Sequence, residues 1–180
     1  KQATKTSKDN YVTVLIMENK TVTKKVLAKE GIKVPVGEEF DSLAEAKISI
    51  NNYIEKPIVI KPKSTNFGTG INIFPEGTNA EDIERAFEIA FKFDKTVLIE
   101  EFIKGKEYRF LVIDDQVVGI LHRVPANVLG DGVKTIRELV ELKNQNPLRG
   151  KGYVTPLEKI NLGENEAIFL KQQNKNFDYV

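Results

Sequence analysis

Helical spacing of apolar residues is clearest between residues 80 and 93. Four residues there recur at the three- and four-residue intervals that share one helix face: Ile83, Ala86, Phe87 and Ala90. Thr78 or Asn79 precedes the stretch as a candidate N-cap. Weaker versions of the pattern predict further helices over 19–29 and 41–53, where capping residues are present, and over 135–143 and 163–172.

Short β-branched and apolar runs predict strands. They cover residues 11–17, 57–61, 71–74, 96–100, 108–113 and 116–124. Asp114-Asp115 separates the last two runs and indicates a hairpin. Because these strands do not alternate singly with helices, we predict an α+β fold rather than a doubly wound sheet or a barrel. The chain then divides into a flexible lead-in, a strand and helix, and two lobes, over 1–10, 11–42, 43–103 and 104–180.

Composition narrows the classes of protein that fit this pattern. The chain has 180 residues, 27 basic and 26 acidic, so its near-zero net charge gives no indication of a nucleic-acid or membrane partner. It has no cysteine, which excludes disulfides and thiol chemistry and fits a cytoplasmic protein. The apolar run from Val12 to Met17 is too short to span a bilayer.

A small-residue loop lies between the predicted strands 57–61 and 71–74. Its core is Lys63-Ser64-Thr65-Asn66-Phe67-Gly68-Thr69-Gly70. Such a loop exposes backbone N–H groups beside a lysine, a combination that suits a polyphosphate. A dinucleotide fingerprint or a Walker loop would need a helix directly after the glycines, whereas a strand is predicted here. A simple hairpin turn is the alternative.

Lysines near this loop are candidate phosphate ligands. Lys61 ends an apolar strand, where burying an ammonium without a partner is costly, so it either faces a phosphate or snorkels to the surface. Lys63 is solvated or makes a second phosphate contact. Lys20 and Lys24 lie four residues apart on one face of the predicted helix 19–29, and that face is either solvated or directed at the phosphates.

Acidic residues follow the predicted strand 96–100. Glu100 and Glu101 are neighbours on a strand, so one can face a cleft while the other faces solvent. The segment 100–103 could offer backbone groups to an adenine edge, and Glu107 could accept hydrogen bonds from ribose hydroxyls. Each acid taken singly is more often a surface charge.

The predicted hairpin contributes a candidate of a different kind. Arg123 alternates with apolar residues, and its guanidinium suits a carboxylate or phosphate, although a solvent-facing position is the alternative. His122 is the only histidine and has no evident nucleophile or acid beside it, so we assign it no catalytic role.

Together these segments resemble the ATP-grasp superfamily. The residues that carry the resemblance are Lys61-Pro62, Gly70, Glu100-Glu101-Phe102-Ile103, Gly105-Lys106-Glu107 and Glu18-Asn19-Lys20. A longer set is similar to the ATP-grasp part of bacterial bifunctional glutathione-synthesis proteins: 61–68, 107–110, 123–128, 130–132 and 143–150. The resemblance covers almost all of the chain after residue 10 and implies two α+β lobes with a nucleotide between them. It makes 43–103 the lid lobe with the glycine loop and 104–180 the first part of the catalytic lobe.

The resemblance also implies the chemistry. It indicates the ATP-binding part of a cytoplasmic ligase that joins γ-glutamylcysteine to glycine through an acyl phosphate, with ATP and Mg²⁺ or Mn²⁺ as cofactors. Arg123 would contact the transferred phosphoryl group or the acceptor carboxylate. The implied nucleotide-binding residues are Lys20, Lys61, Lys63, Ser64, Phe67, Gly68, Thr69, Gly70, Glu100, Glu101, Phe102, Ile103 and Glu107.

The resemblance leads us to expect a fragment that is inactive alone. Family members hold their metal ions in the last strands of the domain, and no acidic cluster follows the final predicted helix here, so we assign no metal ligand before residue 180. A homo-oligomeric parent is compatible with this expectation. The alternatives are a cyanophycin synthetase-like or D-alanine–D-alanine ligase-like enzyme, and a non-enzymatic binding module in which loop and hinge are ordinary turns.

Overall fold

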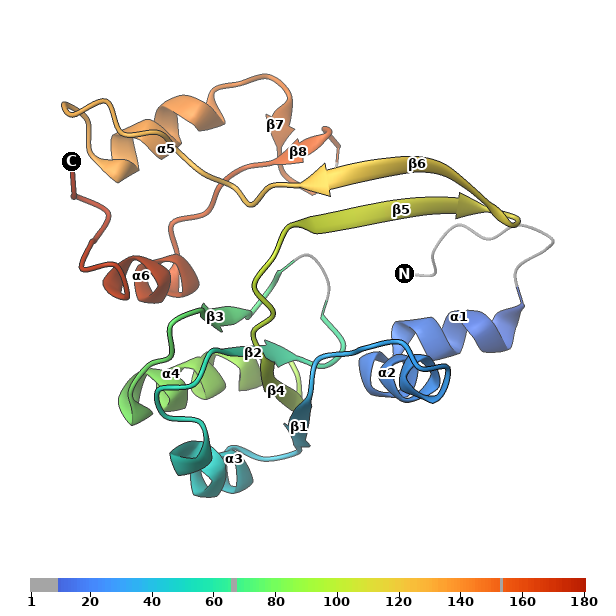
Figure 1. The fold of residues 1–180 in the computed structure, drawn as a ribbon. Coiled ribbons are helices and arrows are strands. Elements are labelled where there is room, and N and C mark those ends of the chain that lie inside the picture. The colour runs from blue at the N-terminus through green and yellow to red at the C-terminus, as the bar shows by residue number, and fades with distance from the viewer. Residues whose placement is uncertain (1–9, 66–67, 153) are drawn as a thin grey trace. The chain divides into compact units, whose positions relative to one another are not determined.

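The computed structural model describes residues 10–65, 68–152 and 154–180, and the chain divides into two compact units (Figure 1). Unit 1 spans Lys1–Ile103 and unit 2 spans Lys104–Val180. Both units combine helices with paired strands, so the predicted α+β class is confirmed. Within the described ranges, no helix is long and apolar enough to cross a membrane.

Unit 1 is built on a four-stranded antiparallel sheet with the order β1-β4-β2-β3. Its strands are β1 (Gly37–Phe40), β2 (Ile58–Pro62), β3 (Asn72–Phe74) and β4 (Val97–Glu101). Its helices are α1 (Tyr11–Glu18), α2 (Lys20–Lys29), α3 (Leu43–Ser49), the single-turn η1 (Ile50–Asn52) and α4 (Ala80–Phe91). The sequence did not predict β1, because its four residues, Gly-Glu-Glu-Phe, contain one apolar side chain and therefore no strand pattern.

Helix α4 covers one face of this sheet. In the antiparallel register Ile60 lies opposite Ile99, and Ile58 opposite Phe74, so these side chains share a face. The fully buried residues that α4 contributes are the four that its spacing predicted, Ile83, Ala86, Phe87 and Ala90. Each large apolar side chain buried in this way contributes roughly 1.5–3 kcal/mol. This core therefore fixes the positions of β2 and β4, which carry the candidate residues.

Capping side chains begin the helices of unit 1. The Asn79 side chain accepts a hydrogen bond from the Asp82 N–H at 2.9 Å, so Asn79 rather than Thr78 begins α4. Ser42 caps α3, and Asn19 caps α2 as predicted. Each cap satisfies a backbone donor that has no partner inside its helix. The predicted stop, Gly31, follows α2 with a φ of +76°.

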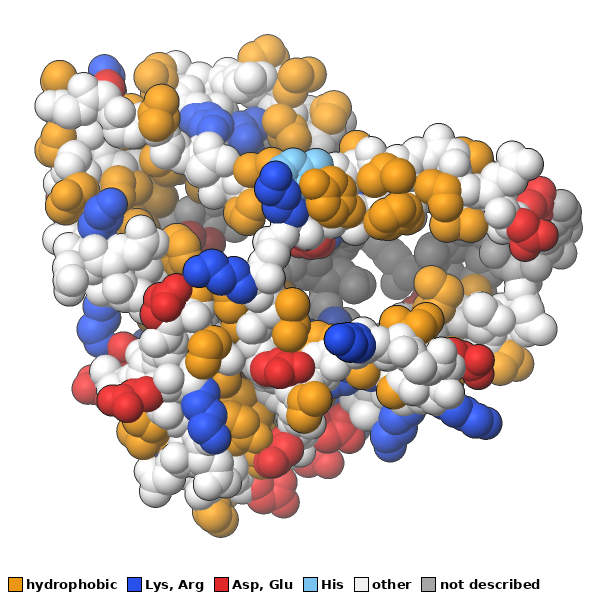
Figure 2. Space-filling model, viewed as in Figure 1, with side chains coloured by type: hydrophobic (Ala, Val, Ile, Leu, Met, Phe, Trp, Pro, Cys, Tyr) orange, Lys and Arg blue, Asp and Glu red, His pale blue; other side chains and the backbone are white. Residues whose placement is uncertain are grey.

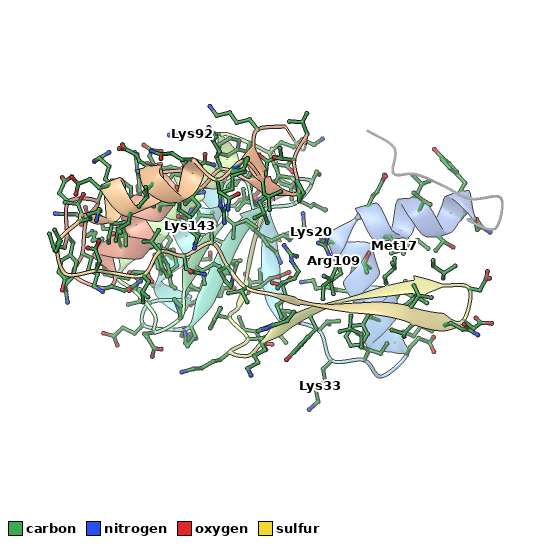
Figure 3. The ribbon with its side chains drawn as sticks, turned by 90° about the horizontal axis from the view of Figure 1, so that it is seen from above. Met17, Lys20, Lys33, Lys92, Arg109 and Lys143 are labelled. Carbon is green, nitrogen blue, oxygen red and sulfur yellow. The ribbon has the colours of Figure 1, made fainter. Side chains whose placement is uncertain are left out.

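The prediction of a strand over 11–17 is wrong. These residues form α1, and the Asn10 side chain caps it by accepting from the Val12 N–H at 2.8 Å. A short apolar run fits a strand or a helix equally well by pattern alone, so the cap before it distinguishes the two. Most side chains of α1 stay exposed, including Met17 with 71% of its surface accessible (Figure 3).

Unit 2 begins with the predicted hairpin, which is confirmed. Strand β5 (Glu107–Ile113) pairs antiparallel with β6 (Gln116–Arg123), and hydrophobic side chains line the exposed surface of the pair (Figure 2). Two helices follow, α5 (Ile136–Asn144) and α6 (Glu164–Lys171), both close to their predicted bounds. The two-residue strands β7 (Arg149–Gly150) and β8 (Leu157–Glu158) form a short parallel pair that the sequence did not predict.

Candidate functional site

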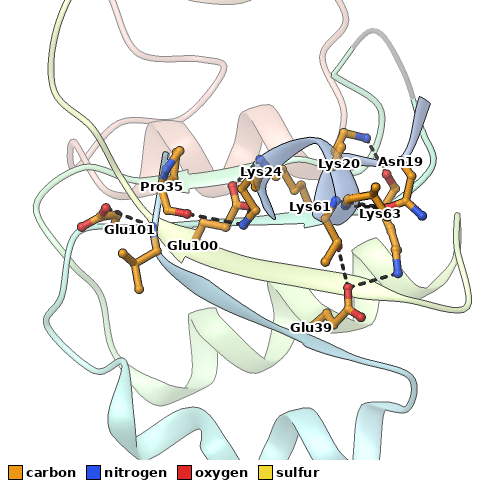
Figure 4. A network of polar contacts seen from close by, with 12 residues as sticks. Asn19, Lys20, Lys24, Pro35, Glu39, Lys61, Lys63, Glu100 and Glu101 are labelled. Carbon is orange, nitrogen blue, oxygen red and sulfur yellow. Dashed lines mark hydrogen bonds and ion pairs between the residues drawn. The ribbon is translucent and has the colours of Figure 1, made fainter. Parts of the chain in front are cut away.

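Charged side chains gather on the face of the unit 1 sheet that lies opposite α4. In the β2–β4 register Glu100 is opposite Val59 and Lys61 is opposite Leu98, which puts Glu100 and Lys61 on that second face. Helix α2 lies over the same face (Figure 4). The residues that meet there are Lys20, Lys24, Lys61, Lys63, Glu39 and Glu100, and we call them the lysine cluster.

Glu100 is the buried centre of the lysine cluster. Its side chain is 3% exposed, and each of its two oxygens has a lysine partner. The Lys24 Nζ lies 2.5 Å from Oε1, while Lys61 pairs with Oε2. Burial pushes the pKa of Glu100 upward, but the hydrogen bonds from Lys24 and then Lys61 outweigh burial, so its pKa lies below the usual value. Glu100 is therefore an ionised carboxylate between two ammonium groups.

The neighbouring Glu101 points to the other face, as the alternation of a strand requires. It is exposed and accepts a hydrogen bond from the Val36 N–H at 3.0 Å. The next residue, Phe102, donates its own N–H to the Pro57 carbonyl at 2.9 Å, while Ile103 is 61% exposed. Glu101 and Phe102 line a cavity of about 600 Å³ within unit 1, whose other lining residues are Val36, Gly37, Glu38, Tyr53, Lys56, Pro57 and Ile58.

Lys20 reaches the start of the glycine loop. Its Nζ donates to the Lys63 carbonyl at 2.6 Å and to the Thr65 carbonyl at 2.9 Å (Figure 4). Burial, and then the like charge of Lys61, lower the pKa of Lys20 below its ordinary value. A bound anion would raise the pKa of Lys20 again and favour its charged form, so Lys20 is suited to bind an anion.

Hydrogen bonds tie the start of the loop to Asp94 and join Thr65 to Thr69 across it. The Ser64 N–H donates to Asp94 Oδ2 at 2.6 Å, and the Thr65 hydroxyl donates to the Thr69 carbonyl at 3.0 Å. Gly68 and Gly70 both have left-handed backbones, with φ of +80° and +72°. Phe67, which the sequence placed in the nucleotide site, lies outside the described residues.

A second ion pair extends the lysine cluster toward β1. Lys63 lies 3.1 Å from Glu39, which also accepts from the Thr21 hydroxyl at 2.7 Å. The Thr21 hydrogen bond, and then that of Lys63, hold the pKa of Glu39 below its usual value. The sequence analysis did not single out Glu39, and it missed Asp94 as well. Glu39 lies within β1, a strand that the sequence did not predict, so it had no signal, whereas the only signal for Asp94 was its position shortly before the predicted strand 96–100.

The remaining two candidates lie in unit 2 and pair with each other. Arg123 Nη1 is 2.7 Å from Glu107 Oε1, and the two residues are directly opposed in the β5–β6 register. Both side chains are at least half exposed, so the pair is open to solvent. In the described part of the chain, no group of three or more His, Asp or Glu side chains could hold a metal ion.

Comparison with known proteins identifies the relatives of this chain. The family model of the RimK-like ATP-grasp domain matches residues 17–131. The glutathione biosynthesis bifunctional protein GshAB of Clostridium perfringens (strain 13 / Type A) is 62% identical over 177 residues. That match covers 98% of this chain and 23% of the relative, so the chain spans about a quarter of the length of the curated relatives it matches.

Solved structures of ligases are similar to parts of this chain. D-alanine–D-alanine ligase from Bacillus anthracis aligns with a TM-score of 0.55 and 28% identity, covering 69% of this chain and 40% of the ligase. The structure of that ligase complexed with ATP aligns with a TM-score of 0.50 and 26% identity, covering 63% and 37%. These alignments support the fold that the family model indicates.

Proposed function

The chain belongs to the RimK-like ATP-grasp family, and from that premise we propose that it is the ATP-binding part of an ATP-dependent carboxylate–amine ligase of glutathione synthesis. The 62% identity to a protein named for glutathione biosynthesis supports this choice of pathway. The observation that carries the proposal is the lysine cluster, in which Lys24 and Lys61 pair with one buried carboxylate and Lys20 lies on the same face, bonded to the start of the glycine loop. The proposed reaction activates the carboxylate of γ-glutamylcysteine as an acyl phosphate, which the amine of glycine then attacks.

The donor set of the lysine cluster fits a triphosphate. Four ammonium groups and two carboxylates leave an excess of positive charge on a partly buried face. Positioned positive charge is the main contribution that proteins make to phosphoryl transfer. We assign Lys20 and Lys61 to phosphate oxygens and Lys63 to a second contact beside them.

The glycine loop would cover the phosphates. Residues Ser64 to Gly70 begin and end at fixed points, Asp94 and the buried Pro62, and the left-handed glycines let the backbone approach a ligand closely. A closed loop would exclude water from the reactive acyl phosphate. ATP supplies the phosphoryl group, and the role of the loop is to shield it.

The other assignments follow the same proposal. The segment from Glu100 to Ile103 would hold adenine, with Glu101 and Phe102 lining the cavity at the end of β4. Glu107 would accept from ribose hydroxyls, and Arg123 would contact the transferred phosphoryl group or the acceptor carboxylate. In that case Glu107 and Arg123 would give up the ion pair between them, and each would bind a part of the substrates instead. The described residues contain no cluster that fits a magnesium or manganese ion, so no metal ligand is assigned to this chain.

Calorimetric titration with a non-hydrolysable ATP analogue tests the proposal. Lys61→Ala removes an ammonium held at the buried carboxylate, while Lys63→Ala removes one whose partner, Glu39, is 40% exposed. We expect Lys61→Ala to weaken binding by about 10- to 100-fold, the worth of one charge-assisted contact, and Lys63→Ala to weaken it by only a few-fold. Equal losses would contradict the assignment of Lys61, and no binding by the folded wild-type chain would contradict the proposed function.

A second candidate is a ligase that acts on D-alanine. The fold similarity to D-alanine–D-alanine ligase favours it, although the identity there is 28% against 62% for the glutathione-synthesis relative. ADP release by a full-length parent distinguishes the two activities. Release that requires γ-glutamylcysteine and glycine supports the first, and release that requires D-alanine supports the second.

A further inference from the structure

Lys24 completes the coordination of Glu100 without being needed to neutralise it. One ammonium balances one carboxylate, and Lys61 already provides that charge. Lys24 adds a second ammonium from another element, helix α2, and its Nζ also lies 3.4 Å from the Pro35 carbonyl. The three side chains together therefore carry a net positive charge at a carboxylate that is 3% exposed (Figure 4).

The placement of this charge matters for an anion. If Lys61 and Glu100 stood alone, a phosphate oxygen approaching Lys61 would meet a neutral pair and the repulsion of the carboxylate. With Lys24 on Oε1, the carboxylate is already balanced, and the charge of Lys61 on Oε2 is left for a ligand. We propose that Lys24 is a positioning residue, which occupies Glu100 so that the ammonium of Lys61 can receive a phosphate oxygen.

This inference rests on the proposed function, because it assumes that a phosphate binds at Lys61. It gives Lys24, which the sequence left as either solvated or directed at the phosphates, a role that involves no contact with the nucleotide. A purely structural role for Lys24 would alter the stability of the fold and leave the anion affinity of the folded chain unchanged. A direct phosphate contact would alter affinity irrespective of Glu100.

Inorganic tripolyphosphate is the probe that separates these roles, since it has no adenine or ribose to contact Glu100. Its affinity is measured by calorimetry for the wild-type 180-residue chain and for Lys24→Met, Glu100→Gln and the double variant that combines them. Lys25→Met is the matched control, because it removes the same charge from an exposed neighbour on α2. Circular dichroism establishes that each variant is folded.

The proposal predicts an order of affinities set by the charge around Lys61. We expect Glu100→Gln to bind most tightly, the wild type and the double variant to bind alike, and Lys24→Met to bind about 10- to 100-fold more weakly than the wild type. Lys25→Met should stay within about threefold of the wild type, because water and salt screen an exposed charge. Lys24→Arg, which keeps the charge, should restore most of the affinity that Lys24→Met loses.

Each of the following results would overturn the proposal. Wild-type affinity in Lys24→Met would show that Lys24 has no influence on the anion. A double variant as weak as Lys24→Met would indicate a direct phosphate contact by Lys24. Should Lys24→Met not fold, a double variant clearly weaker than the wild type would contradict the proposal on its own. If the wild type binds neither the ATP analogue nor tripolyphosphate, the proposed function fails as well, whereas binding of both without the predicted order removes only this inference.

Discussion

Gly68 and Gly70 allow the backbone strain of the loop to be separated from its packing. Both have left-handed backbones, with φ of +80° and +72°. A Cβ added at Gly68 meets no heavy atom within 4 Å among the described residues. A Cβ added at Gly70 would lie 2.8 Å from Phe93 Cδ2 and 2.9 Å from Pro62 Cγ. Alanine is thus strained at both positions but obstructed at only one.

The expected cost follows from these two contributions. A left-handed backbone costs alanine roughly 1–2 kcal/mol relative to glycine, offset in part by the lower entropy of the unfolded chain, so Gly68→Ala should cost about 1 kcal/mol. At Gly70 the ring of Phe93 is 51% exposed and can rotate away, but Pro62 is fully buried and its ring cannot. Overpacking of this kind adds about 1–3 kcal/mol, so Gly70→Ala should cost about 2–4 kcal/mol.

Equilibrium urea unfolding, followed by circular dichroism, measures both losses. Gly31→Ala is the control for backbone strain alone, because φ there is +76° and an added Cβ again finds no described atom within 4 Å. We expect Gly31→Ala and Gly68→Ala to lose similar free energies of unfolding and Gly70→Ala to lose clearly more. Equal losses at Gly68 and Gly70 would refute the argument that Pro62 anchors the end of the loop.

Three further predictions follow from the described contacts. Glu100→Gln leaves two partly buried ammonium groups without their carboxylate and should lower the free energy of unfolding by about 2 kcal/mol, against less than about 0.5 kcal/mol for the exposed Glu101→Gln. The folded pKa of Glu100 lies below its ordinary value of 4.5, so the stabilisation from its charge is fully present above pH 4.5 and is lost as pH falls through the folded pKa. Urea titrations in acid should therefore find a smaller difference in unfolding free energy between the wild type and Glu100→Gln. Thr135→Ala removes the capping box of α5 and should cost unit 2 about 1 kcal/mol in thermal unfolding. Tripolyphosphate affinity should fall as pH rises toward 10.5, since an anion favours the protonated form of Lys20, and Lys20→Met should flatten that slope. The charged groups that act on Lys20 are Lys61, Asp94 and Glu100.

The sequence was sufficient to predict an element of the fold where the local pattern and the tertiary packing require the same residues. Helix α4 is an example, because its apolar spacing, its cap and its buried face coincide. The pattern was insufficient for α1, because the short, mostly apolar run from Val12 to Met17 is compatible with the period of a strand and with that of a helix, and the cap at Asn10 distinguishes them. It also missed β1, which joins the sheet through backbone pairing with β4 and has a single apolar side chain, Phe40, packed against Phe87 of α4.

Individual residues of the candidate site could be predicted from the sequence, but the ion pairs between them could not. Lys61 was identifiable because an ammonium at the end of a buried strand needs a partner. The identity of that partner depends on the register between β2 and β4, which places Glu100 beside Lys61 although they are far apart in sequence. Lys24 was one lysine of a helix face that also suited solvent. Only the packing of α2 on the sheet distinguishes it from the exposed Lys25.

Gly37 leaves space in the sheet beside the buried carboxylate of Glu100. It lies opposite Glu100 in the β1–β4 register, and a Cβ there would lie 2.0 Å from the Ile99 carbonyl oxygen and 2.7 Å from Glu100 Cα. Any larger residue would push β1 away from β4 at the point where the carboxylate is buried. The same strand carries Glu39, two residues further on and on the same face, which pairs with Lys63. Strand β1 therefore supplies one carboxylate of the lysine cluster, Glu39, and through Gly37 leaves room on the adjacent β4 for the other, Glu100.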